Sequence, residues 1–181
     1  MNTMKYLAGY PEPLVEQVRQ LMAQGWLAAL LVQRYPDAHA VRTDAALYGY
    51  VAEIKAAFMR NAEPLSRVTY DNRLQAVRQA LGTHTAISRV QGGKLKAKRE
   101  IRIAGLFRDL PAPFLRMIAV HELAHLKARE HDKAFYQLCR HMEPDYHRYE
   151  LDLRAYLCHL ESGGAALWPA RRQEAGRADP A

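Results

Sequence analysis

Apolar residues recur three and four positions apart along much of the chain, which is the spacing of one face of an α-helix. The first such segment, 11–34, is predicted as one helix with prolines in its first turn. A second helix is expected to begin at a cap at Thr43 or Asp44 and to end before 61–64. A last helix is expected over 146–161. We interpret these apolar faces as packing between helices.

The middle of the chain has a mixed pattern that favours short strands. Residues 66–70 are predicted as one strand, and 73–81 as a helix that ends at a glycine. Residues 83–90 and 100–104 are rich in β-branched residues and are predicted to form two antiparallel strands joined by a basic loop. The middle therefore adds a small antiparallel sheet to the helices on either side.

The segment His121-Glu122-Leu123-Ala124-His125 has the spacing of a metal site on a helix. Residues four apart lie on one helix face, so His121 and His125 can bind the same ion. Glu122 projects beside them, where it can take a proton from a metal-bound water. Two histidine ligands and a general base on one helix are the zincin arrangement of zinc hydrolases. Apolar residues 118–120 precede the motif and can keep the site dry.

A catalytic zinc site needs a third protein ligand and an open fourth position. His131 qualifies only if the metal helix ends before it, because on a continuous helix it would lie ~9 Å further along the axis and about 80° away from His121. Asp132 is a good N-cap for a new helix, so we expect His131 in a turn between two helices. Glu143 is a competing ligand, but Pro144 after it disfavours a helical position. We favour His131.

The whole pattern predicts an α+β, zincin-like fold with N-terminal helices, a small antiparallel sheet, the metal helix and C-terminal helices. The chain has 181 residues, which suits one domain over 1–161, followed by a Gly-, Ala-, Pro- and Arg-containing tail over 162–181 that is predicted to be disordered. No secretory signal or membrane span is recognised. The two cysteines, Cys139 and Cys158, are isolated, which is typical of a reducing cytoplasm, where we expect the protein. The oligomeric state cannot be predicted.

The charge of the chain indicates an anionic partner. The net charge is +7, and part of it lies in a segment where Lys94, Lys96 and Lys98 alternate with other residues. In an extended chain these lysines share one face. Together with Arg89 and the backbone N–H groups of Gly92–Gly93 they can bind phosphate. Alternatively, the lysines protect an exposed strand edge from aggregation. The residues alone support both interpretations equally.

Four polar aromatic residues follow the metal motif, namely Tyr136, His141, Tyr146 and His147. A tyrosine or histidine near the metal can stabilise negative charge that develops in a transition state. Aromatic and histidine side chains are also common on helix surfaces without any such role. For each single residue we favour the second interpretation.

Several segments resemble the YgjP-like metallopeptidase domain family, which is related to the SprT-like and WLM zinc hydrolases. The similar segments are 88–98, 114–118, 121–138 and 141–144, and the resemblance extends over roughly 5–160. It implies one catalytic zinc ion, or another divalent metal, held by His121, His125 and His131, with Glu122 as the catalytic residue. Because it includes the basic segment, it also favours phosphate binding there. Relatives with longer motifs often carry glycine in the turn where this chain has Ala128.

Three functions are compatible with these features. The first is a zinc metallopeptidase, in which an edge strand holds an extended peptide. The second, which the resemblance also implies for one branch of the family, is a UTP pyrophosphatase that releases UMP and diphosphate. The third, without catalysis, is a nucleic-acid-binding protein with a structural zinc; Glu122 and the open metal position count against it. The expected partner is therefore a peptide or a nucleotide, with nucleic acid unproven and no membrane.

Overall fold

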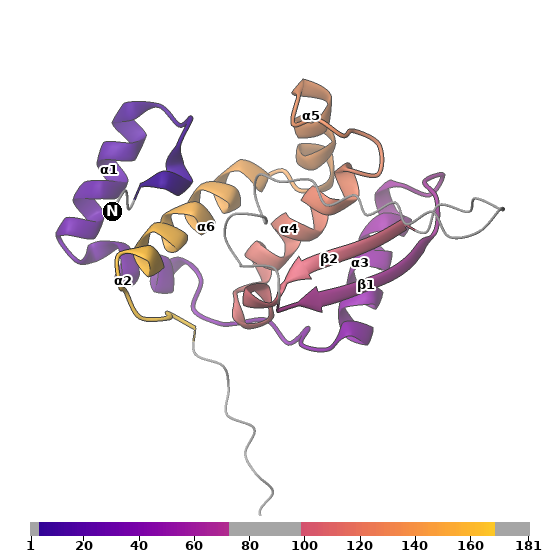
Figure 1. Cartoon of the computed structure of the whole chain (residues 1–181), viewed down its shortest axis with the longest axis horizontal. Coiled ribbons are helices and arrows are strands. Elements are labelled where there is room, and N and C mark those ends of the chain that lie inside the picture. Colours follow the sequence, from indigo (N-terminus) through magenta and orange to yellow (C-terminus); the bar gives the residue numbers. More distant parts are fainter. Residues whose placement is uncertain (1–3, 73–98, 169–181) are drawn as a thin grey trace, which may run out of the picture.

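The computed structural model describes residues 4–72 and 99–168. The elements along the chain are a short 3-10 helix η1 (Lys5–Leu7), α1 (Glu12–Ala23), α2 (Trp26–Arg34), α3 (Asp44–Phe58), β1 (Leu65–Asp71), β2 (Arg99–Ala104), a 3-10 helix η2 (Gly105–Asp109), α4 (Ala112–Ala124), α5 (Lys133–Met142) and α6 (Tyr146–Glu161). In Figure 1, α1 and α2 lie at one end of the molecule and α3 with the two strands lies at the other. The α+β class is confirmed.

Helix α4 occupies the centre of the molecule and contacts α3, α5, α6 and β2 (Figure 1). It begins behind Pro111, whose fixed φ suits the start of a helix. Nine of its residues are buried: Phe114, Leu115, Met117, Ile118, Ala119, Val120, His121, Leu123 and Ala124. A helix that is apolar on all sides is stable only when it is covered on all sides. The core is therefore built around the helix that carries the metal motif.

The two strands differ from the expected antiparallel sheet. Strands β1 and β2 are confirmed near 66–70 and 100–104, but they pair in parallel, with Val68 opposite Ile101 and Tyr70 opposite Ile103. The described sheet is thus parallel, not antiparallel as expected, whereas the antiparallel pair predicted between 83–90 and 100–104 is not tested. Parallel neighbours need a long connection, and residues 72–98 separate the two strands in the sequence. The helix predicted over 73–81 and the strand predicted over 83–90 lie outside the described residues.

The single helix predicted over 11–34 is also wrong, because the chain forms two helices there. Gly25 lies between them with φ 71°, a left-handed conformation that glycine adopts without strain. Its N–H donates to the carbonyl of Met22, which closes the end of α1. The apolar spacing continues across this turn, so spacing alone does not reveal the break. None of the described helices is long and apolar enough to cross a membrane.

The last helix, α6, agrees with the prediction of 146–161 and packs against α4, α2 and η1. Beyond it, the indole N–H of Trp168 donates to the carbonyl of Tyr35 at 2.7 Å, and Trp168 is only 4% exposed. Its ring also lies against Phe114 and Tyr156. The packed part of the chain thus reaches residue 168, beyond the expected boundary at 161.

Candidate metal centre

Three histidines meet where α4 ends and α5 begins. Helix α4 ends at Ala124, and His125 is its C-cap, so the chain turns away just after the second histidine. His131 lies in this turn. Asp132 caps α5 by accepting a hydrogen bond from the backbone N–H of Phe135 at 2.9 Å. The predicted end of the metal helix and the predicted cap are both confirmed, and the turn brings His131 back to the other two histidines.

The three Nε2 atoms form a nearly equilateral triangle. The Nε2 atom of His121 lies 3.2 Å from that of His125 and 3.2 Å from that of His131, and the last two atoms are 3.1 Å apart. Tetrahedral zinc with Zn–N bonds of about 2.05 Å separates its nitrogen ligands by about 3.3 Å. A cation placed between three imidazole nitrogens also relieves the repulsion of their lone pairs. The donor set and its spacing therefore fit one divalent ion.

The Nδ1 atoms of His121 and His125, which point away from the triangle, have neutral hydrogen-bond partners. Nδ1 of His121 lies 2.8 Å from the hydroxyl of Tyr146, and Nδ1 of His125 lies 3.0 Å from the carbonyl of Ala128. A proton held on Nδ1 leaves the lone pair of Nε2 available for a metal. Ala128 serves in the turn without strain, because no described residue other than glycine has a positive φ. The glycine found in relatives is thus not required here.

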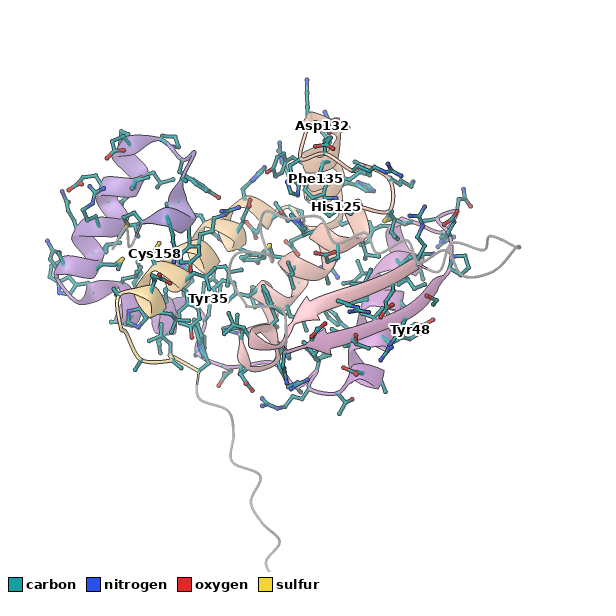
Figure 2. The ribbon with its side chains drawn as sticks, viewed as in Figure 1. Tyr35, Tyr48, His125, Asp132, Phe135 and Cys158 are labelled. Carbon is teal, nitrogen blue, oxygen red and sulfur yellow. The ribbon has the colours of Figure 1, made fainter. Side chains whose placement is uncertain are left out.

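Phe135 packs against all three histidine rings. Its ring centroid lies 4.9 Å from that of His121, 4.6 Å from that of His125 and 4.6 Å from that of His131, and the side chain is fully buried. Figure 2 shows Phe135 next to His125 at the top of the molecule, below Asp132. One aromatic side chain on α5 therefore packs against histidines from two segments of the chain.

Glu122 follows the first ligand on α4 and remains partly exposed. The surrounding protein atoms nevertheless desolvate its carboxyl group and raise the pKa of Glu122 to about 7. A bound cation nearby opposes this effect, because it favours the ionised carboxylate. A carboxyl group whose pKa can approach neutrality is suited to accept a proton and to release it again.

The competing ligand Glu143 is engaged elsewhere. Its carboxylate lies 3.4 Å from the Arg116 guanidinium and accepts a hydrogen bond from the backbone N–H of Asp145 at 3.1 Å. The one group of potential metal ligands found among the described residues consists of the three histidines. The geometry thus supports His131 as the third ligand.

The predicted helper residues lie at different distances from the ligands. The ring of Tyr136 is 6.3 Å from that of His131 and 5.3 Å from that of His147, and Tyr136 is half-buried while His147 is exposed. His141 instead packs edge-on against Phe58. Tyr146 is buried behind His121. Of the four, Tyr136 and His147 remain candidates for contact with a substrate.

The predicted phosphate-binding residues Arg89, Lys94, Lys96 and Lys98 lie outside the described residues, so their interactions stay a prediction. The neighbouring arginines of β2 pair with carboxylates. Arg99 lies 2.6 Å from Glu63, and Arg102 lies 3.5 Å from Asp71. These pairs reduce the positive potential of β2 itself.

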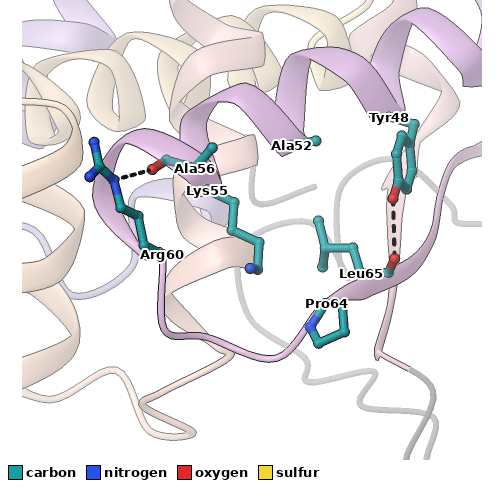
Figure 3. A pocket seen from close by; sticks show the side chains of 7 residues that line it. All are labelled: Tyr48, Ala52, Lys55, Ala56, Arg60, Pro64 and Leu65. Atoms are coloured by element: carbon teal, nitrogen blue, oxygen red, sulfur yellow. Dashed lines mark hydrogen bonds between the residues drawn. The ribbon is translucent and has the colours of Figure 1, made fainter.

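A separate pocket of about 410 Å³ lies between α3 and the start of β1 (Figure 3). It is lined by Tyr48, Ala52, Lys55, Ala56, Arg60, Pro64 and Leu65. Polar groups at its edge are occupied, since Tyr48 donates to the carbonyl of Leu65 and Lys55 donates to that of Ala62. None of the histidine ligands lines this pocket, so we place the chemistry at the histidines.

Sequence reasoning did not assign Tyr146 and Phe135 to the support of the ligands. The sequence places both near the motif, but only packing shows that one contacts Nδ1 of His121 and the other contacts all three rings. An aromatic residue four positions after His131 is the one available signal for Phe135. No local signal identifies Tyr146.

The chain is similar to known proteins over most of its length. Residues 69–156 match the model of a family described as YgjP-like, metallopeptidase domain. The UTP pyrophosphatase of Escherichia coli (strain K12) is 56% identical over 163 residues, which cover 90% of this chain and 98% of that protein. No solved structure matches the chain.

Proposed function

Because the chain belongs to the YgjP-like metallopeptidase domain family and is a metal-dependent hydrolase, we propose that it hydrolyses UTP, or a closely related nucleoside triphosphate, to the monophosphate and diphosphate. The observation that carries the hydrolytic part is the triangle of three Nε2 atoms, and Glu122 directly follows His121 on the same helix. The choice of substrate is supported by the name of the 56% identical relative.

The proposed metal is zinc, held by His121, His125 and His131. Three imidazole ligands suit zinc, whereas magnesium prefers oxygen ligands. When bound, a zinc ion supplies Lewis-acid polarisation and makes a water molecule a better nucleophile at neutral pH. The hydrogen-bond partners of His121 and His125 are uncharged, so they do not offset the positive charge of a bound ion. A site with this positive charge favours a polyanionic substrate.

Glu122 is the proposed general base. Its carboxylate accepts the proton of the attacking water and then delivers it to the leaving diphosphate oxygen. The bond that forms joins the water oxygen to the α-phosphorus, and the bond that breaks joins that phosphorus to the oxygen bridging to the β-phosphorus. No oxidant or further co-reactant is needed, so atoms and charge balance with water alone.

The triphosphate also needs cationic partners. We propose Arg89, Lys94, Lys96 and Lys98 for this role, supported by their alternation and by the net charge of +7. Removing two of these lysines together should raise KM for UTP more than it lowers kcat if they bind the phosphates that do not react. An equal fall of kcat instead would assign them to the transition state.

A peptidase is the second candidate, and the description of the family as a metallopeptidase domain favours it. The same three histidines and Glu122 can act on a peptide carbonyl, because the site polarises an oxygen and moves a proton in either reaction. The two candidates differ in the electrophile only, so a direct substrate assay separates them.

The test is diphosphate release by zinc-loaded protein from UTP, CTP, ATP and GTP, with an unstructured protein as a peptidase substrate in parallel. Glu122→Gln should retain zinc and lose about 10²- to 10⁴-fold in rate. Glu130→Gln is the matched control, since Glu130 is exposed in the turn after the motif. In ¹⁸O-labelled water the label should enter UMP. Peptide cleavage without release from any triphosphate would overturn the nucleotide proposal.

A further inference from the structure

Tyr146 begins α6 and is fully buried between α6 and the metal helix. Its hydroxyl lies 2.8 Å from Nδ1 of His121, and the two rings are nearly parallel, with 14° between their planes. Nε2 of His121 faces the other two histidines. The hydroxyl of Tyr146 therefore lies behind the ligand, on the side away from the metal, where a substrate does not reach.

The hydrogen bond has a defined direction when a metal is bound. A histidine that binds through Nε2 carries its proton on Nδ1, and a buried N–H without an acceptor costs about 1–3 kcal/mol. The Tyr146 oxygen is the acceptor here. A tyrosine hydroxyl both donates and accepts hydrogen bonds, so Tyr146 can accept from Nδ1 and keep its own proton.

We propose that Tyr146 is a positioning residue that fixes the tautomer and the ring orientation of the metal ligand His121. The proposal rests on the metal site of the proposed function and adds a residue that none of the comparisons assigns. This role differs from the transition-state role that was weighed for Tyr146, and not favoured, from the sequence. Partners of this kind behind a metal-bound histidine typically affect metal affinity 10- to 100-fold.

If Tyr146 served only to fill space with its ring, Tyr146→Phe would bind zinc as tightly as the wild type. Tyr146→Phe keeps the ring and removes the acceptor, so packing is conserved while His121 loses its partner. Tyr156→Phe is the matched control, because Tyr156 lies on the same helix and is 1% exposed. Both variants lose the hydroxyl of a buried tyrosine, but only the Tyr146 hydroxyl contacts one of the three histidines.

The experiment measures the zinc dissociation constant of the wild type and both variants by competition with a chromophoric chelator at pH 7.5. Tyr146→Phe should bind zinc 10- to 100-fold more weakly, and Tyr156→Phe should stay within about 2-fold of the wild type. Unchanged zinc affinity in Tyr146→Phe, or an equal loss in both variants, overturns the proposal.

A second measurement needs no variant and covers the case in which Tyr146→Phe does not fold. In the zinc-loaded wild type, nitrogen-15 NMR should show the His121 proton on Nδ1, exchanging slowly and close in space to the Tyr146 ring. A proton on Nε2, or fast exchange at Nδ1, overturns the proposal. Failure of the wild type to bind zinc overturns the proposed metal site first, and this inference with it. Normal zinc binding without UTP hydrolysis affects the proposed substrate alone.

Discussion

Phe135 offers a direct test of whether packing around the ligands prepares them for a metal. Phe135→Leu keeps a buried apolar side chain but removes three ring contacts, with centroid distances of 4.6 to 4.9 Å to the three histidines. Each aromatic pair contributes about 0.5–1.5 kcal/mol beyond area burial, so we expect a loss of about 2 to 4 kcal/mol of unfolding free energy in the metal-free protein. The zinc dissociation constant should also rise, because the imidazoles must then be ordered when the metal binds.

The assay combines urea unfolding of the metal-free proteins with chelator competition for zinc. Phe107→Leu is the control, since Phe107 in η2 is 1% exposed and contacts none of the three histidine rings among the described ring pairs. It should lower stability and leave zinc affinity within about 2-fold. Loss of zinc affinity in the control alone, or unchanged affinity in Phe135→Leu, would refute the view that α5 preorganises the ligands.

Two further predictions concern metal removal and the cysteines. Chelation should lower the melting temperature, measured by calorimetry, by about 5 to 10 °C relative to protein in zinc at 100 times its dissociation constant. Added zinc should restore the melting temperature of the wild type but not that of His125→Ala. Equal melting temperatures with and without zinc would contradict the proposed metal site. Burial raises the pKa of the Cys139 thiol to about 12 and that of the Cys158 thiol to about 11, so at pH 8 about one thiol in 10³ or fewer is ionised and native protein should resist alkylation until urea exposes it. Rapid alkylation of native protein, measured by mass spectrometry, would show that these side chains are accessible.

The local parts of the site were readable from the sequence because each depends on nearby residues. Histidines four apart share a helix face whatever the rest of the chain does. The cap at Asp132 and the end of the metal helix before His131 also follow from local backbone chemistry, and the structure confirms both. The last helix was predicted with its bounds because a turn and a change in composition flank it.

Other features required the tertiary structure. The direction of β2 relative to β1 is not encoded in the alternation of either strand, since a parallel and an antiparallel pair expose the same faces. The break at Gly25 was missed because the apolar spacing continues through the turn. From the sequence, only Pro144 favoured His131 over Glu143 as the third ligand. The contact of Glu143 with Arg116 in the structure supports the same choice directly.

The sequence by itself determined which functional groups the chain supplies. These are two histidines and a carboxylate on one helix, a third histidine in a turn, and a net positive charge. Only the tertiary structure decided which residues make those groups a site. Tyr146 follows His121 by 25 residues and Phe135 lies on another helix, yet both contact its ring. Local periodicity reports which face of a helix is buried, but the partner that buries it is set by how all the helices pack together, because packing depends on side chains far apart in the chain.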